Sequence, residues 1–269
     1  MAERGVQPRT ILISGASSGI GLATARRFAH AGDTVFNLDV RAPSEAEPGI
    51  VWLSCDVTDW ESIGAAVAEA HVRGGAVDVA VANAGISVRH AVLDITRADA
   101  LRVLDVNLLG VLGLWTSAAR HMLAGGSGVL LATASTNALA GYPYYADYNA
   151  SKAGVVALTR TLALELSPII RTACIAPGYI LTPMQRAEYT DAMLEDVNQR
   201  IPLRRHGEAA EVAELFFFLA SEQARFVTGQ SIVLDGGELA GGTASLHGLA
   251  AQPGAPSEPS MSRQGNQDR

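Results

Sequence analysis

Short runs of β-branched and aliphatic residues alternate along the chain with longer segments in which apolar positions recur at helical spacing. This alternation is typical of βαβ units that assemble into a parallel sheet. The predicted strands are residues 10–14, 34–39, 51–54, 77–82, 128–133, 171–175 and 231–234. The clearest predicted helices are residues 19–31, 60–72, 97–122, 148–166 and 209–220.

The hydrophobic pattern also predicts the layering and the extent of the domain. Residues 77–82 are apolar except for Asp78, as expected for a strand that is buried on both faces. We therefore expect one α/β domain over residues 1–239, a doubly wound parallel sheet of about seven strands with helices on both faces. From Ala240 the periodicity stops and Gly, Ala, Ser, Pro and Gln dominate, which predicts a disordered tail over residues 240–269.

Composition narrows the class of partner. The 269 residues are 48% hydrophobic, which suffices for a large core, and the formal net charge is −7. A nucleic-acid surface or an anionic membrane would require a basic face, so we expect neither partner and favour a small molecule.

The cysteine content and the N-terminal segment predict a cytoplasmic protein. Cys55 and Cys174 are too few for a disulfide framework and lie in strand-like apolar runs. The N-terminal residues lack the apolar centre of a signal peptide, and no uninterrupted apolar run approaches the roughly 18 residues of a membrane span. No His or Cys cluster has metal-ligand spacing, so no metal is expected.

A glycine-rich turn follows the first strand and opens the first helix. Its residues are Gly15, Ala16, Ser17, Ser18, Gly19, Ile20 and Gly21. Glycines let the backbone turn tightly and approach a pyrophosphate, whose charge is favoured by the N-terminal end of a helix. The spacing G-x-x-x-G-x-G differs from the commoner G-x-G-x-x-G, but the strand–turn–helix context predicts a Rossmann-type dinucleotide site.

The end of the second strand indicates which dinucleotide binds. Asp39 lies twenty residues beyond Gly19, where a carboxylate accepts hydrogen bonds from both ribose hydroxyls of adenosine and repels a 2′-phosphate. Neither Ser18 nor Val40 supplies a cation, so NAD is expected rather than NADP. Arg41 leaves NADP use open, because its guanidinium can reach a phosphate.

Lys152 is the only lysine among twenty basic residues, and it follows Tyr148 by four positions. At this spacing on a helix the phenol and the ammonium share one face. A nearby cation favours phenolate and lowers the pKa of tyrosine from about 10, which suits it to act as a general acid or base.

Together these motifs resemble the short-chain dehydrogenase/reductase family, and the match runs from the first strand to about Gly237. In that family Thr is usual at the position of Ser14. The resemblance implies that Asp56 and Val57 contact adenine and that Asn83, Ala84 and Gly85 border the cofactor. It also implies that a segment after the sixth strand closes on nicotinamide, through Pro177, Gly178, Ile180 and Thr182.

The resemblance further implies a catalytic set of Ser135, Tyr148, Lys152 and Asn107. Ser135, thirteen residues before Tyr148, would hydrogen-bond the substrate oxygen, and Tyr148 would transfer the proton. Lys152 would bind the nicotinamide ribose and lower the pKa of Tyr148. Asn107 would hold a water that joins Lys152 to solvent. The chain departs from the family at residues 169–173, which are one residue short, and at Asn137, where small apolar residues are common.

The expected substrate pocket is rich in tyrosine. Four of the six tyrosines lie in residues 142–148, where the family builds one pocket wall. Tyr142, Tyr145 and Asn137 are candidate contacts for a ring or a polyol, although Tyr144 or Tyr145 could equally have a packing role. His90 is a further candidate at the pocket mouth. Residues 184–201 occupy the place of the family's mobile substrate lid.

We therefore expect an NAD-dependent oxidoreductase that interconverts a secondary alcohol, such as a hydroxylated ring, diol or polyol, and its ketone. One alternative is a 3-oxoacyl-thioester reductase, which usually takes NADPH. Another is a catalytically silent NAD-binding regulatory protein on the same fold. The helix 148–166 is apolar around much of its circumference, and family members are commonly homotetramers, so a homotetramer is expected.

Overall fold

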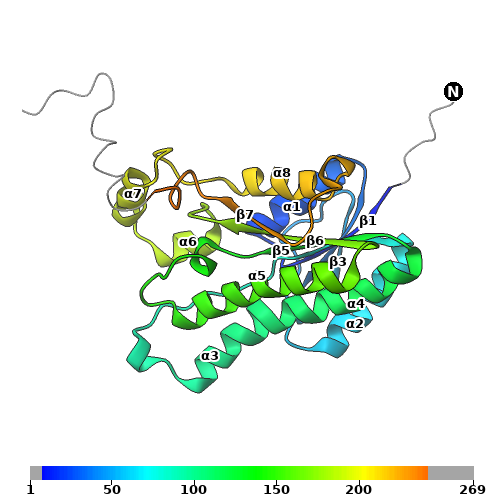
Figure 1. The fold of residues 1–269 in the computed structure, drawn as a ribbon, viewed down its shortest axis with the longest axis horizontal. Helices are drawn as coiled ribbons and strands as arrows, with labels where there is room; N and C mark the ends of the chain where they lie inside the picture. Colours follow the sequence, from blue (N-terminus) through cyan, green and yellow to red (C-terminus); the bar gives the residue numbers. More distant parts are fainter. Residues whose placement is uncertain (1–7, 242–269) are drawn as a thin grey trace, which may run out of the picture.

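The protein is described by a computed structural model over residues 8–241, whose centre is a seven-stranded parallel sheet (Figure 1). The strand order is β3-β2-β1-β4-β5-β6-β7, and every pairing is parallel. All seven predicted strands are present, and β3, β6 and β7 are slightly longer than expected. The strands are β1 Thr10–Ser14, β2 Thr34–Asp39, β3 Ile50–Ser54, β4 Val77–Ala82, β5 Gly128–Thr133, β6 Ile170–Pro177 and β7 Gln230–Leu234.

Helices cover both faces of this sheet, as predicted. Figure 1 shows α1 and α8 on one face, with α2, α4 and α5 on the other. The α-helices are α1 Gly19–His30, α2 Trp60–Gly74, α3 Arg97–Leu104, α4 Gly110–Gly125, α5 Ala146–Leu166, α6 Pro183–Glu188, α7 Asp191–Arg200 and α8 Ala209–Leu219. Four shorter helical elements are η1 Val92–Asp94, η2 Asp105–Leu109, η3 Thr136–Ala138 and η4 Glu222–Ala224.

The sheet separates two hydrophobic cores, because successive side chains of a strand point to opposite faces. In β5, Leu130 packs into the core under α2, α4 and α5, whereas Leu131 packs into the core under α1 and α8. The first core is centred on Trp115, and the second holds Phe28 and Phe216. Burial on both faces explains why the central strands have nearly continuous apolar sequences.

The strand order reverses direction between β1 and β4. From β1 the chain proceeds to β2 and β3 on one side, and then crosses back to β4 on the other. Crossovers that diverge in this way leave a crevice at the carboxyl ends of the strands, which is where α/β sheets bind ligands. The glycine turn and the 83–86 turn both lie at this point.

The predicted single helix over residues 97–122 is wrong in one respect. The structure divides it into α3 and α4 at the π-helical turn η2, and α4 continues to Gly125. π-turns are rare and often occur at functional sites. The interruption fully buries Asn107.

One helical stretch is long and apolar enough to be compared with a membrane span. By length and mean hydropathy (1.2), the stretch Arg97–Gly125 qualifies as a membrane-spanning candidate, although 39% of its apolar window is buried in the fold. A core helix passes the same test, and α4 packs against α2 and β4. Of the predicted tail, residues 242–269 lie outside the described part of the chain.

Candidate active site

A cleft of about 540 Å³ lies at the carboxyl ends of β1, β2 and β4, and most of the predicted cofactor residues line it. Those that do are Gly15, Ser18, Gly19, Ile20, Asp39, Asp56, Val57, Asn83, Ala84, Gly85, Tyr148, Lys152 and Thr182. Ser17 and Gly21 are not among the residues that line it. Pro177, Gly178 and Ile180 line an adjoining pocket instead.

The glycine turn has the geometry that a pyrophosphate requires. Gly15 has a φ of +68°, and a Cβ there would lie 2.8 Å from Ala84 Cα. A Cβ at Gly21 would lie 2.2 Å from the Gly15 carbonyl oxygen. Ser18 makes no side-chain capping bond to α1, and the first turn of α1 contains no acidic residue. The N-terminal end of α1 is thus open to a bound anion.

Asp39 is held rigidly at the end of β2. Its Oδ2 accepts a hydrogen bond from the Ser17 amide at 3.1 Å, and its Oδ1 accepts one from the Arg41 amide at 3.0 Å. Each carboxylate oxygen keeps a further acceptor position for a ribose hydroxyl. The Arg41 side chain is exposed at the edge of the cleft.

Asn83 ties the ends of three strands together beneath the cleft. Its Nδ2 donates to the carbonyls of Ser14 and Gly15, and its Oδ1 accepts from the Thr133 hydroxyl at 2.9 Å. The Ser14 hydroxyl accepts hydrogen bonds from the amides of Asn83 and Ala84. Ser14 therefore supplies the hydroxyl for which the family usually has Thr.

Lys152 lies on the α5 face that points toward the cleft. Its Nζ donates to the Thr133 carbonyl at 2.8 Å and lies 5.7 Å from the centroid of the Tyr148 ring. The side chain is buried, and burial lowers the pKa of Lys152 to about 8. A compact ammonium is thus placed beside the phenol, as the sequence predicts.

Asn107 fastens the turn after β4 to α5. Its Oδ1 accepts from the Ile86 amide at 2.8 Å, and its Nδ2 donates to the Ile86 carbonyl at 2.9 Å. Nδ2 also lies 3.2 Å from the Ser151 hydroxyl. The side chain therefore holds the cleft wall next to Lys152, and its role in a proton relay stays a prediction.

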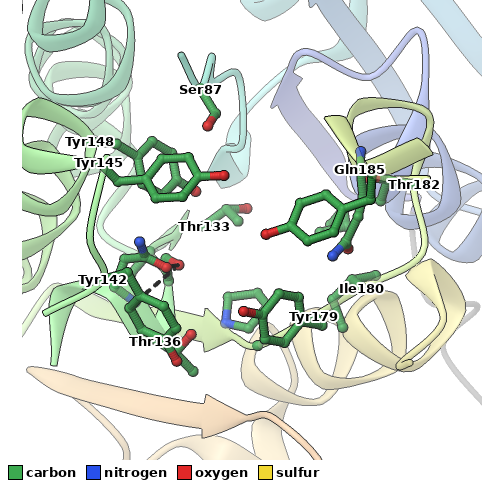
Figure 2. Close-up of a pocket in the computed structure, with 17 residues that line it drawn as sticks. Ser87, Thr133, Thr136, Tyr142, Tyr145, Tyr148, Tyr179, Ile180, Thr182 and Gln185 are labelled. Carbon is green, nitrogen blue, oxygen red and sulfur yellow. Dashed lines mark hydrogen bonds between the residues drawn. The ribbon is translucent and has the colours of Figure 1, made fainter. Parts of the chain in front are cut away.

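A second cavity of about 170 Å³ adjoins the cofactor cleft, and most of the predicted substrate residues line it (Figure 2). Tyr148 lines both cavities, and so do Thr133 and Thr182. Figure 2 shows Tyr145 and Tyr148 on one side of this substrate pocket, opposite Thr182 and Gln185. Ser135, Asn137, Tyr142 and Tyr145 all line it, as the sequence predicts.

Ser135 is oriented by a chain of amides. Its hydroxyl donates to Asn137 Oδ1 at 3.1 Å, and Asn137 Nδ2 donates to Asn149 Oδ1 at 2.7 Å. Asn149 in turn donates to the Tyr142 carbonyl at 2.9 Å. Because Asn149 directly follows Tyr148 on α5, this chain fixes the serine loop relative to the tyrosine helix.

His90 is not among the residues that line the substrate pocket. Its Nε2 lies 3.2 Å from Asp147 Oδ2, and its amide donates to the Tyr144 carbonyl. Asp147 Oδ1 accepts from the Tyr148 amide at 2.8 Å. The imidazole thus braces the start of α5, a long-range contact that the sequence position of His90 did not indicate.

Tyr179 lines the pocket and was not singled out from the sequence as a substrate residue. Gln185 and Tyr189, from the segment expected to be the substrate lid, line it as well. Glu238, in the turn after β7, accepts a hydrogen bond from the Tyr142 hydroxyl. No signal in the sequence indicated Glu238, because its contact with Tyr142 spans 96 residues.

These positions suit proton transfer to or from an oxygen bound between the two cavities. Tyr148 lies at the junction, with a cation behind it and the serine hydroxyl in the same pocket. The adjoining cleft offers an open helix N-terminus and a fixed carboxylate, which fit the pyrophosphate and the ribose of a dinucleotide. Within residues 8–241, no group of three or more His, Cys, Asp or Glu residues could hold a metal ion.

Comparison with known proteins identifies chains of similar sequence. A family model described as enoyl-(acyl carrier protein) reductase matches residues 15–238. The chain is 38% identical to cis-4-hydroxycyclohexanecarboxylate dehydrogenase of Sinomonas cyclohexanicum, over 85% of this chain and 96% of that protein. It is 36% identical to the 3-oxoacyl-[acyl-carrier-protein] reductase MabA of Mycobacterium bovis, over 88% of this chain and 96% of that protein.

A solved structure extends the similarity to the fold. Ligand-free aldohexose dehydrogenase of Thermoplasma acidophilum superposes with a TM-score of 0.83 at 28% identity. The match covers 88% of this chain and 96% of that one.

Proposed function

Because the chain belongs to the short-chain dehydrogenase/reductase family and is an oxidoreductase of CH–OH groups, we propose that it uses NAD to interconvert a hydroxylated ring or diol and its ketone. The observation that carries this proposal is the position of Tyr148. It lines both the dinucleotide cleft and the substrate pocket, beside Lys152 and in one cavity with Ser135.

The protein residues act on the substrate oxygen and its proton. Bound nicotinamide supplies the hydride chemistry. Tyr148 removes the hydroxyl proton during oxidation and returns it to the carbonyl during reduction. The Ser135 hydroxyl turns from Asn137 toward the substrate oxygen, where charge develops, a role typically worth about 2.7–4 kcal/mol. Lys152 favours the phenolate and binds the ribose of the cofactor.

The cofactor preference depends on Asp39. The buried Asp39 side chain accepts two backbone hydrogen bonds, so it is held in place and cannot turn away from a 2′-phosphate. NAD, with its free ribose hydroxyls, is therefore the expected cofactor. Arg41 is the one cation that the described residues place at this end of the cleft lining.

The substrate class is proposed from the pocket. Its cavity is small, at about 170 Å³, and hydroxyl and amide groups alternate with aromatic rings around it. Such a lining suits a compact ring that carries hydroxyl groups. The similarity to dehydrogenases named for a hydroxycyclohexane acid and an aldohexose supports the same class.

A ketoacyl-thioester reductase is the second candidate, since the chain is also 36% identical to MabA. Asp39 and the small cavity weigh against it. A silent NAD-binding protein is the third, and the complete set of Ser135, Tyr148, Lys152 and Asn107 weighs against that one.

One assay separates the three candidates. The absorbance of reduced cofactor is followed with NAD and NADP against cyclic alcohols, diols, sugars and hydroxyacyl thioesters. We expect turnover of cyclic secondary alcohols with NAD. Preference for a thioester with NADP would support the reductase, and cofactor binding without any turnover would support the silent protein.

The proposal includes a homotetrameric assembly and a cytoplasmic location. Helix α5 carries an exposed Leu164, which a neighbouring subunit would cover in a homotetramer. Cys55 and Cys174 are both buried free thiols, consistent with a reducing cytoplasm. Light scattering that gives a monomer mass would remove the tetramer.

A further inference from the structure

Glu238 places a carboxyl group directly behind one wall of the substrate pocket. Tyr142, a pocket residue, donates a hydrogen bond from its hydroxyl to Glu238 Oε1. On the other side, a Cβ at Gly178 would lie 2.9 Å from Glu238 Oε2, so this oxygen lies directly behind the Gly178 backbone of the lining. Gly178 and Tyr142 thus separate the carboxyl from the pocket by one layer of atoms.

The second oxygen of this carboxyl has no partner. Oε2 is inaccessible to solvent and accepts no hydrogen bond from the described residues. Because Oε2 is sealed from solvent, no substrate group can bond to it, and the carboxyl acts on the pocket through its charge.

No cation among the pocket-lining residues neutralises the Glu238 carboxylate. The seventeen residues that line the pocket include no Lys, Arg or His. Lys152 is nearby, but its Nζ points to the Thr133 carbonyl in the cofactor cleft. Burial raises the pKa of Glu238, and the hydrogen bond from Tyr142 opposes this shift by stabilising the ionised form.

We propose that Glu238 sets the substrate specificity of this pocket: it favours uncharged alcohols and rejects substrates that carry a carboxylate. The inference rests on the proposed function and narrows it. It distinguishes this chain from the relative named for a hydroxycyclohexanecarboxylate, with which it shares 38% identity.

The test compares two substrates that share the reacting alcohol and differ in the group at the far end, a carboxylate in one and an uncharged hydroxymethyl in the other. These are cis-4-hydroxycyclohexanecarboxylate and cis-4-(hydroxymethyl)cyclohexanol. The ratio of kcat/KM for the neutral to the acidic substrate is measured for the wild type, for Glu238→Gln and for Glu69→Gln. Glu69→Gln is the matched control, because it removes an exposed carboxylate from α2, outside the residues of both cavities.

We expect the wild type to favour the neutral alcohol, and Glu238→Gln to lower the ratio about ten- to fiftyfold, the size of like-charge repulsion across several ångströms of protein. The change should appear mainly in KM for the acid. The ratio of Glu69→Gln should match the wild type. A wild type that prefers the acid, or a ratio in Glu238→Gln within about threefold of the wild type, would overturn the proposal.

A binding measurement tests the role of Glu238 even if the proposed function fails. If no alcohol is turned over, the proposed function fails, but the pocket can still be examined by saturation-transfer NMR with cyclohexanecarboxylate and cyclohexylmethanol. Glu238→Gln should then bind the carboxylate at least about tenfold more tightly than the wild type does. Equal affinities, with melting temperatures that show both proteins folded, would refute the role of Glu238.

Discussion

The cofactor cleft and the substrate pocket meet at Tyr148, but different kinds of backbone form them. The cleft lies on strand ends and short turns, where Asp39 and Asn83 are fixed by hydrogen bonds to neighbouring strands. The pocket is formed largely by long connections, which bring Tyr142, Tyr179 and Glu238 together from distant parts of the chain. The rigid half of the site, the cofactor cleft, thus fixes the dinucleotide. The loop-built half, the substrate pocket, can differ between proteins according to the substrate.

This difference predicts that changes in the two halves separate in their effects. Substitutions in the cleft should alter cofactor affinity, and substitutions in the pocket should alter substrate turnover with the cofactor still bound. Tyr148, at the junction, should show the largest loss in catalysis.

Tyr148→Phe removes the proton donor and keeps the ring. We expect kcat to fall by about 10²–10⁴-fold, the range of general acid–base catalysis, because Tyr148 is the one phenol that the described residues place in both cavities. The NAD dissociation constant, measured by fluorescence titration, should stay within about threefold of the wild type. Retention of more than about a few per cent of activity would show that Tyr148 is not the acid–base group.

Asp39→Ala tests the rigid half. Loss of two ribose hydrogen bonds to a charged acceptor should weaken kcat/KM for NAD by about ten- to a hundredfold and reduce discrimination against NADP. Steady-state kinetics with both cofactors measures this. Arg41→Ala is the control, and its NAD kinetics should resemble those of the wild type. If Asp39→Ala leaves the NAD/NADP ratio unchanged, the carboxylate does not select the cofactor.

Asn137→Ala tests the loop-built half through a positioning residue. Without the amide bridge from Ser135 to Asn149, the serine hydroxyl is less well oriented, and kcat should fall about tenfold with NAD affinity unchanged. Asn137→Asp keeps the acceptor for Ser135 and should recover part of kcat. Equal losses in Asn137→Asp and Asn137→Ala would assign Asn137 a different role.

Lys152→Met addresses stability, where the expected effect is smallest. Burial lowers the pKa of Lys152 from its ordinary 10.5 to about 8, so the unfolded chain binds more protons between these pH values. Wild-type stability therefore rises with pH across this window. At pH 7 the variant should be more stable by about 1–3 kcal/mol, after loss of the bond to the Thr133 carbonyl.

Thermal unfolding from pH 7 to 10.5 measures this difference. The advantage of Lys152→Met should shrink as the pH rises through about 8 toward 10.5. A constant advantage, or a wild type more stable than the variant at pH 7, would contradict a buried and strained ammonium.

The same contrast explains what the sequence could predict. Asp39, Gly15 and Lys152 act through local spacing on a strand end, a turn and a helix, and the structure places them where the pattern indicated. The π-turn at Asn107 has no local signal, since neither Pro nor a Gly pair marks it. His90 and Glu238 depend on contacts 57 and 96 residues away, which periodicity does not encode.

The central claim is that Tyr148 and Ser135 act on one substrate oxygen at the junction of the two cavities. The most direct measurement is a crystal structure of the protein with NAD and cyclohexane-1,4-diol. The account predicts the reacting oxygen within about 3.2 Å of both Tyr148 Oη and Ser135 Oγ, and adenosine ribose on Asp39. A diol oxygen bound away from Tyr148, with Ser135 still hydrogen-bonded to Asn137, would contradict it.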